Sequence, residues 1–206
     1  MNGLIGKKVG MTSMYDEAGR NIACTVIEVN PNIVTQVKTE ETDGYDALQV
    51  GSVEARPKRT SKAMLGHFDK ASTGPKQFLV EFRNSYLEKA LGDEVNITDV
   101  VAEGDIVAAV GKSKGKGFQG VVKRHGFAGV NDATHGQHNR QRAPGSIGAA
   151  SDPSKVFKGM RMGGRTGNTR VKIRNLRVMK IFEDKNLILL KGAVPGHKGS
   201  TIIIEK

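Results

Sequence analysis

Runs of apolar, β-branched residues recur along most of this chain and alternate with short polar stretches. Gly, Asn, Asp or Pro bounds most of these runs, which is the pattern of strands joined by turns. The predicted strands are Ala23–Val29, Ile33–Val37, Ala47–Val53, Phe78–Phe82, Ile106–Val110, Val171–Ile181, Leu187–Leu190 and Thr201–Ile204. Their number and spacing favour a small barrel or sandwich, so we expect a mainly β fold with minor α content.

Two short helices are also predicted, near residues 60–71 and 84–91. Thr60 or Ser61 can cap the first helix, and Asn84 can cap the second. Neither helix carries residues that indicate chemistry. Both are therefore expected to be structural parts of the β domain.

Charge changes this picture, because the chain of 206 residues has a net charge of +11 and the excess is confined to one segment. Residues 111–180 contain 16 Lys or Arg against two acidic residues, a net +14, while the remainder has 16 basic and 19 acidic residues, a net −3. Thirteen of the 26 glycines lie between Gly111 and Arg170, where few apolar runs could form a core. We expect a β-barrel body of residues 1–110 and 171–206, with residues 111–170 forming a long, largely irregular basic extension.

Such a charge excess indicates a polyanionic partner, with nucleic acid first and an anionic membrane surface second. In the extension, long cations alternate with glycine, which lets a backbone approach a ribose-phosphate chain closely. A smaller basic run begins at Arg56. The residues predicted to contact RNA are Lys112, Lys114, Lys116, Lys123, Arg124, His125, His135, His138, Arg140, Arg142, Ser146, Lys155, Lys158, Arg161, Arg165 and Arg170, together with Arg56, Lys58 and Arg59.

Three patterns in the extension suggest other chemistry. Gly115–Gly120 matches the dinucleotide fingerprint G-x-G-x-x-G, but the acid expected about 20 residues later is missing. His125, His135 and His138 suggest a metal site, but zinc needs three or four ligands at consistent spacing and only Asp132 lies near enough in the sequence to join them. Ser146 lacks the surroundings of a catalytic serine. We therefore expect no catalytic residue, metal or cofactor, and keep a nucleotide-cofactor enzyme and a general nucleic-acid-binding protein as alternatives.

The only cysteine, Cys24, lies in an apolar run and is predicted to be a small buried hydrophobic residue. One cysteine allows no internal disulfide, which suits a reducing compartment. The sequence shows neither a signal peptide nor a membrane-spanning stretch, so we expect a cytoplasmic protein without a membrane partner.

Several stretches together resemble a known family. These are Gly3–Thr12 (GLIGKKVGMT), Gly115–Phe127 (GKGFQGVVKRHGF), Thr134–Gly136, Gly145–Gly148 (GSIG) and Val156–Met160. In order and spacing they are similar to the bacterial-type "L three" family of large-subunit ribosomal proteins, over essentially the whole chain.

The resemblance implies a translation-factor-like β-barrel body and a loop that penetrates large-subunit rRNA toward the peptidyl transferase centre. It also implies an early role in subunit assembly, neighbouring large-subunit ribosomal proteins as partners, and no small-molecule substrate. Some bacterial members carry a methylated glutamine after the GSIG motif. Ala149 occupies that position here, so no modification is expected there.

Overall fold

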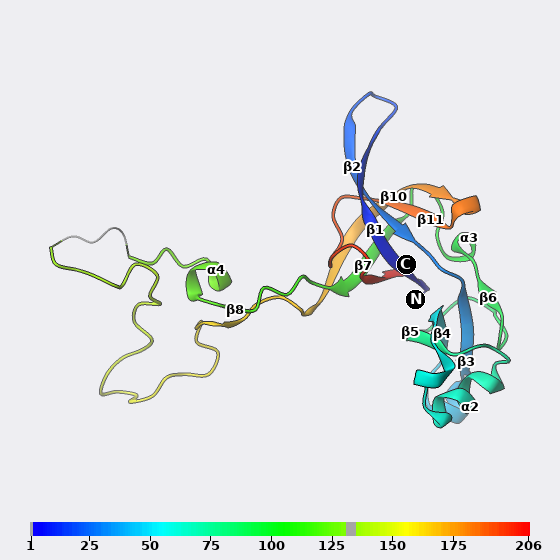
Figure 1. Cartoon of the computed structure of the whole chain (residues 1–206), viewed down its shortest axis with the longest axis horizontal. Helices are drawn as coiled ribbons and strands as arrows, with labels where there is room; N and C mark the ends of the chain where they lie inside the picture. Colours follow the sequence, from blue (N-terminus) through cyan, green and yellow to red (C-terminus); the bar gives the residue numbers. More distant parts are fainter. Residues whose placement is uncertain (1, 131–134) are drawn as a thin grey trace. The chain divides into compact units, whose positions relative to one another are not determined.

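Six antiparallel strands form a closed barrel in the computed structural model, which describes residues 2–130 and 135–206 (Figure 1). Around the barrel the order is β1-β12-β7-β10-β11-β2. The strands are β1 (Gly3–Tyr15), β2 (Asn21–Glu28), β7 (Ile106–Lys112), β10 (Arg170–Phe182), β11 (Leu187–Lys191) and β12 (Thr201–Glu205). The predictions of a mainly β fold and of a β-barrel are therefore confirmed.

Strands from both sides of the basic segment share this barrel. β7, which precedes the segment, pairs directly with β10, which follows it, and Arg170 lies opposite Lys112 in the register. β12 pairs with β7 on one side and with β1 on the other. The polypeptide therefore leaves the barrel and returns to it on neighbouring strands.

β1 is a strand that the hydrophobic pattern did not predict, because its glycines and lysines resemble a turn. Its glycines mark close approach instead. A Cβ added at Gly3 would lie 2.1 Å from Cε1 of Phe82, and one added at Gly6 would lie 2.6 Å from Cγ2 of Ile27. Glycine is needed here because neighbouring side chains occupy the space of a side chain.

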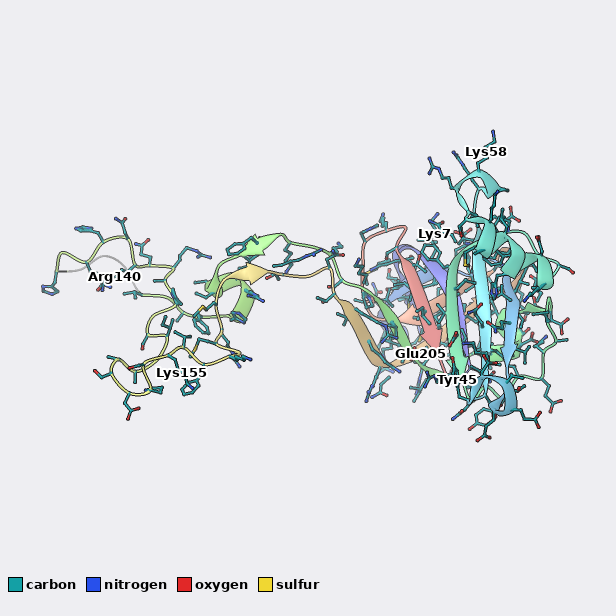
Figure 2. All side chains as sticks on the ribbon, turned by 90° about the horizontal axis from the view of Figure 1, so that it is seen from below. Lys7, Tyr45, Lys58, Arg140, Lys155 and Glu205 are labelled. Atoms are coloured by element: carbon teal, nitrogen blue, oxygen red, sulfur yellow. The ribbon has the colours of Figure 1, made fainter. Side chains whose placement is uncertain are left out.

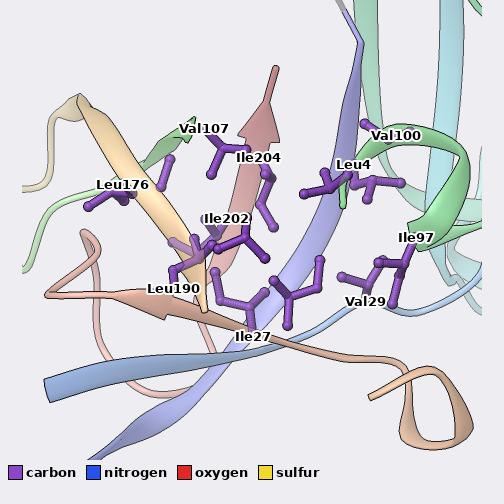
Figure 3. Close-up of a cluster of buried hydrophobic side chains, with 14 of the residues drawn as sticks. Leu4, Ile27, Val29, Ile97, Val100, Val107, Leu176, Leu190, Ile202 and Ile204 are labelled. Carbon is purple, nitrogen blue, oxygen red and sulfur yellow. The ribbon is translucent and has the colours of Figure 1, made fainter. Parts of the chain in front are cut away.

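The barrel interior is filled by aliphatic side chains from all six strands (Figure 3). Leu4, Ile27, Ile202 and Ile204 have no exposed surface. Helix α3 (Ile97–Val100) adds its two terminal residues to the same cluster, and a capping box between Asn96 and Asp99 begins it. The body thus has a continuous core made without Trp.

A second sheet has the order β5-β4-β3-β6. Its strands are β3 (Asn32–Lys38), β4 (Ala47–Glu54), β5 (Lys76–Arg83) and β6 (Glu94–Val95). The elements between them are α1 (Glu40–Asp43), the 3-10 turn η1 (Pro57–Arg59) and α2 (Lys62–Lys70), and a second 3-10 turn, η2 (Glu183–Lys185), joins β10 to β11. Ser61 caps α2 by accepting a hydrogen bond from the backbone N–H of Met64 at 3.4 Å.

The helix predicted at residues 84–91 is absent, and that prediction was wrong. Asn84 has a left-handed backbone with φ 49°, so it ends β5 and does not start a helix. Oδ1 of Asn2 accepts hydrogen bonds from the Tyr86 N–H and the Ser85 hydroxyl, and that hydroxyl accepts one from the Leu87 N–H. These bonds, two of them to the distant Asn2, satisfy donors that a first helical turn would leave free.

The chain divides into two compact units. One comprises Met1–Ser113 and Arg170–Lys206, and the other is Lys114–Thr169. The second unit contains β8 (Phe118–Gln119), β9 (Gly164–Arg165) and α4 (Val121–His125), and its remaining described residues form turns and irregular backbone. In the described ranges, none of the helices has the length and apolar character needed to cross a membrane.

Candidate RNA interface

The Lys114–Thr169 unit begins and ends in a short two-stranded neck. β8 and β9 pair antiparallel, with Phe118 opposite Arg165. The N–H of Lys116 donates to the carbonyl of Thr166, and the N–H of Thr166 donates to the carbonyl of Gly117, both at 2.9 Å. These hydrogen bonds fix the outgoing and returning segments side by side.

Helix α4 secures the returning segment a few residues further on. Nη1 of Arg124 donates to the carbonyl of Met162 at 2.8 Å, and Nε2 of His125 lies 3.0 Å from the same oxygen. Val121, on the same helix, is 3% exposed. Arg124 and His125, predicted as RNA contacts, thus also have a structural role inside the unit that the sequence did not reveal.

The unit has almost no interior of its own. Among its described residues, Val121 is the only buried one. Large apolar side chains are exposed to solvent instead: the exposed fraction is 78% for Phe118 and 58% for Phe157. Apolar side chains of this size that lie in solvent are available to pack against a partner.

The unit carries ten Lys or Arg against two acidic residues. No ion pair engages any of the ten within the part of the chain that the structure describes. In Figure 2, the labelled Arg140 and Lys155 lie on stretches without helix or strand. All ten are exposed, namely Lys114, Lys116, Lys123, Arg124, Arg140, Arg142, Lys155, Lys158, Arg161 and Arg165.

Polar groups gather at two places along the irregular backbone. His138, Asn139, Gln141 and Arg142 line a shallow hollow of about 390 Å³. Further on, Nζ of Lys155 lies 5.7 Å from the centre of the Phe157 ring. Both places expose hydrogen-bond donors beside flat groups, which suits phosphates and unstacked bases.

Five of the predicted RNA contacts lie in the barrel unit, in two separate groups. Lys112 and Arg170 are partners across β7 and β10, and Nη2 of Arg170 lies 3.8 Å from Oε1 of Glu205. Arg56, Lys58 and Arg59 lie on or beside η1, between β4 and α2, and all three are exposed.

The geometry does not fit a dinucleotide site or a catalytic serine. The Gly115–Gly120 stretch contains β8, and α4 after it has five residues, unlike the tight turn and long helix of a dinucleotide site. Ser146 donates to the carbonyl of Gly148 at 3.0 Å, so its hydroxyl stabilises a turn. Asp132 of the metal hypothesis and Thr134 of the family motif lie outside the described residues. Within the described residues, no group of three His, Cys, Asp or Glu side chains could hold a metal ion.

A closed antiparallel barrel joined to a basic, acid-poor unit, whose described residues include one buried side chain, is typical of a structural protein that binds RNA. Residues 48–186 match the family model described as ribosomal protein L3. The chain is also 57% identical over 205 residues to the large ribosomal subunit protein uL3 of Salinibacter ruber, and the match covers 100% of this chain and 99% of that relative. The chain therefore belongs to the ribosomal protein L3 family, whose members are structural proteins of the ribosome and not enzymes.

Proposed function

We propose that this protein is a structural constituent of the large ribosomal subunit in the cytoplasm, where it binds large-subunit rRNA directly through residues 111–170. In this role it nucleates subunit assembly, contacts neighbouring ribosomal proteins and supports the region near the peptidyl transferase centre. One observation carries the proposal: ten exposed cations lie in a unit whose only buried described residue is Val121. A unit of this kind gains its stabilising contacts from a polyanion.

The physical mechanism is displacement of counterions. Where rRNA strands crowd together, each Lys or Arg that contacts a phosphate releases a condensed cation into solution. With about eight such contacts, the logarithm of affinity falls against the logarithm of salt concentration with a slope of roughly −6 to −7. Specificity comes from the fit of irregular backbone to RNA shape, with contacts to base edges secondary.

A charge-reversal experiment tests the role of the extension. The Arg140→Glu/Arg142→Glu protein changes two exposed cations in the irregular part of the unit. We expect a salt slope shallower by about two and a loss of protected nucleotides in large-subunit rRNA. Lys185→Glu/Lys198→Glu, which changes two exposed cations of the barrel unit, is the matched control. Equal loss in both proteins would assign the effect to net charge alone and refute the proposal for the extension.

Competition with bulk DNA separates this function from general nucleic-acid binding. A ribosomal role requires that a large-subunit rRNA fragment resist an excess of duplex DNA, because A-form and irregular RNA present a different shape. Equal competition by both nucleic acids would favour the general alternative. In cells, the protein is expected to co-sediment with large subunits and to stay bound through a moderate salt wash.

A further inference from the structure

A hollow of about 850 Å³ lies in the barrel unit, and all of its lining residues belong to that unit. The end of β4, the turn η1, helix α2 and the start of β5 surround it. Its lining includes Arg56, Arg59, Met64, Phe68, Lys76 and Leu79. The family assignment does not explain this cavity, and the basic run that begins at Arg56 forms one of its walls.

Three cations border the hollow without a fixed partner. Within the described residues, Arg56, Arg59 and Lys76 form no ion pair. One carboxylate, Glu54, also lines the hollow, and it lies opposite Lys76 in the strand register. Three positive charges against one negative charge leave the cavity with an excess that favours an anionic group.

The turn that carries the arginines is held by its own hydrogen bonds. The carbonyl of Arg56 accepts from the Arg59 N–H at 2.9 Å and from the Thr60 hydroxyl at 3.2 Å, and the Thr60 N–H donates to the carbonyl of Pro57 at 3.1 Å. The backbone between the two guanidinium groups is therefore fixed before any ligand arrives. Figure 2 shows the neighbouring Lys58 projecting from the same turn.

Apolar side chains complete the lining of the hollow. Phe68 is 1% exposed and belongs to the buried core of the barrel unit, while Met64 and Leu79, which also line the hollow, are half-buried. Met is flexible and polarisable, so it adapts to a flat aromatic group. The cavity therefore combines a cationic border with an apolar wall, as a site for a nucleotide requires.

We propose that this hollow binds one unpaired nucleotide of large-subunit rRNA. The base would lie against Met64 and Leu79, and Arg56 and Arg59 would contact the flanking phosphates. Arginine suits this role because its planar fork matches phosphate oxygens, and single-stranded RNA is recognised by unstacked bases placed on apolar surfaces. The charge excess favours RNA over an ordinary protein segment. The inference rests on the proposed function, because it requires that rRNA reach this part of the barrel unit.

Crosslinking from inside the hollow tests the position of the base. The full-length protein carries p-benzoylphenylalanine in place of Met64, is assembled with large-subunit rRNA and is irradiated. We expect a crosslink to one short rRNA segment. The same replacement at Ala63, an exposed neighbour on α2 that does not line the hollow, is the matched control and should give no crosslink at those nucleotides. A crosslink from position 64 to a ribosomal protein, or no RNA crosslink, would overturn the proposal.

Footprinting tests the cationic border separately. Arg56→Glu/Arg59→Glu should abolish protection of the crosslinked nucleotides, lower affinity roughly tenfold or more and make the salt slope shallower by about two. Lys62→Glu/Lys70→Glu changes the same charge on exposed α2 residues outside the hollow and should retain that protection. Unchanged protection in the arginine variant would overturn the inference. Protection by the extension is read in the same experiment, so a failure of the proposed function is recognised independently.

Discussion

Replacement of Gly167 by alanine is the sharpest test of the neck that carries the extension. Gly167 has a left-handed backbone with φ +74°, and a Cβ at this position would lie 2.0 Å from the carbonyl oxygen of Lys114. Real Cβ atoms essentially never approach another atom closer than 3.0 Å. Because the obstructing atom belongs to the backbone, the outgoing segment at Lys114 must itself move to admit the methyl group.

The expected cost follows from these two effects. A left-handed backbone costs an L residue roughly 1–2 kcal/mol, and displacement of the neighbouring strand adds to that. A total above about 2 kcal/mol corresponds to a loss of rRNA affinity of roughly 30-fold or more, if the bound protein retains this neck. The barrel does not include Gly167, so its thermal unfolding should be unchanged.

Two further glycines separate the contributions. Gly159 has φ +85° with no atom within 4 Å of an added Cβ, so Gly159→Ala measures backbone strain alone. Gly120 has no left-handed backbone and equally open surroundings, so Gly120→Ala should be nearly neutral. Filter binding to an rRNA fragment at several salt concentrations gives the three affinities. If Gly167→Ala bound as tightly as Gly120→Ala, the neck would not be the conformation that binds RNA.

Three other predictions concern the stability of the barrel unit and are measured by urea unfolding. Ser52 is fully buried and its hydroxyl has no hydrogen-bond partner among the described residues. Ser52→Ala should therefore stabilise the protein by about 1 kcal/mol. A loss of stability would contradict the absence of a partner for this hydroxyl. Nζ of the buried Lys8 donates hydrogen bonds to the carbonyls of Val194 and Gly196 at 2.8 and 3.1 Å. Lys8→Met should therefore lower the free energy of unfolding by about 2–3 kcal/mol. An unchanged free energy would show that the 194–196 loop relaxes. The hydrogen bond from Lys38, followed by that from Tyr45, lowers the pKa of Glu81 below its ordinary value of 4.5. As pH falls, the carboxylate of Glu81 therefore binds a proton in the unfolded protein before it does so in the folded protein. Its contribution to stability is thus fully present above pH 4.5 and is lost as pH falls through the lower folded pKa. Glu81→Gln should remove this part of the acid sensitivity, and an unchanged pH profile would contradict the assignment.

The sequence predicted most strands because β-branched runs bounded by turn residues are a local signal. The strand β1 was not predicted from this signal. Its glycines, Gly3 and Gly6, are required because of Phe82 and Ile27, which are distant in the chain. The helix predicted at 84–91 failed for the same reason, because Asn2 supplies the competing hydrogen bonds.

The candidate site, too, has features that local sequence patterns reveal and features that only tertiary contacts create. The cations of the extension are visible in the charge distribution, and the burial of Cys24 followed from its apolar run and is confirmed. The contact of Arg124 with Met162 joins residues 38 positions apart, which no local pattern encodes. The hollow beside Arg56 likewise needs Lys76 and Leu79 from a later strand. The charge distribution thus predicted the type of partner, whereas the hollow and the Arg124–Met162 contact depend on tertiary contacts.

The place of β12 between β1 and β7 has a consequence for biosynthesis. Translation proceeds from the N-terminus, so residues 114–169 leave the exit tunnel before residues 201–205, which seal the barrel. A nascent chain therefore displays its basic segment while β1 and β7 still have unpaired edges. Such edges promote aggregation, and the final strand removes both at once. Emergence of β12 is thus the step that closes the barrel and removes these edges.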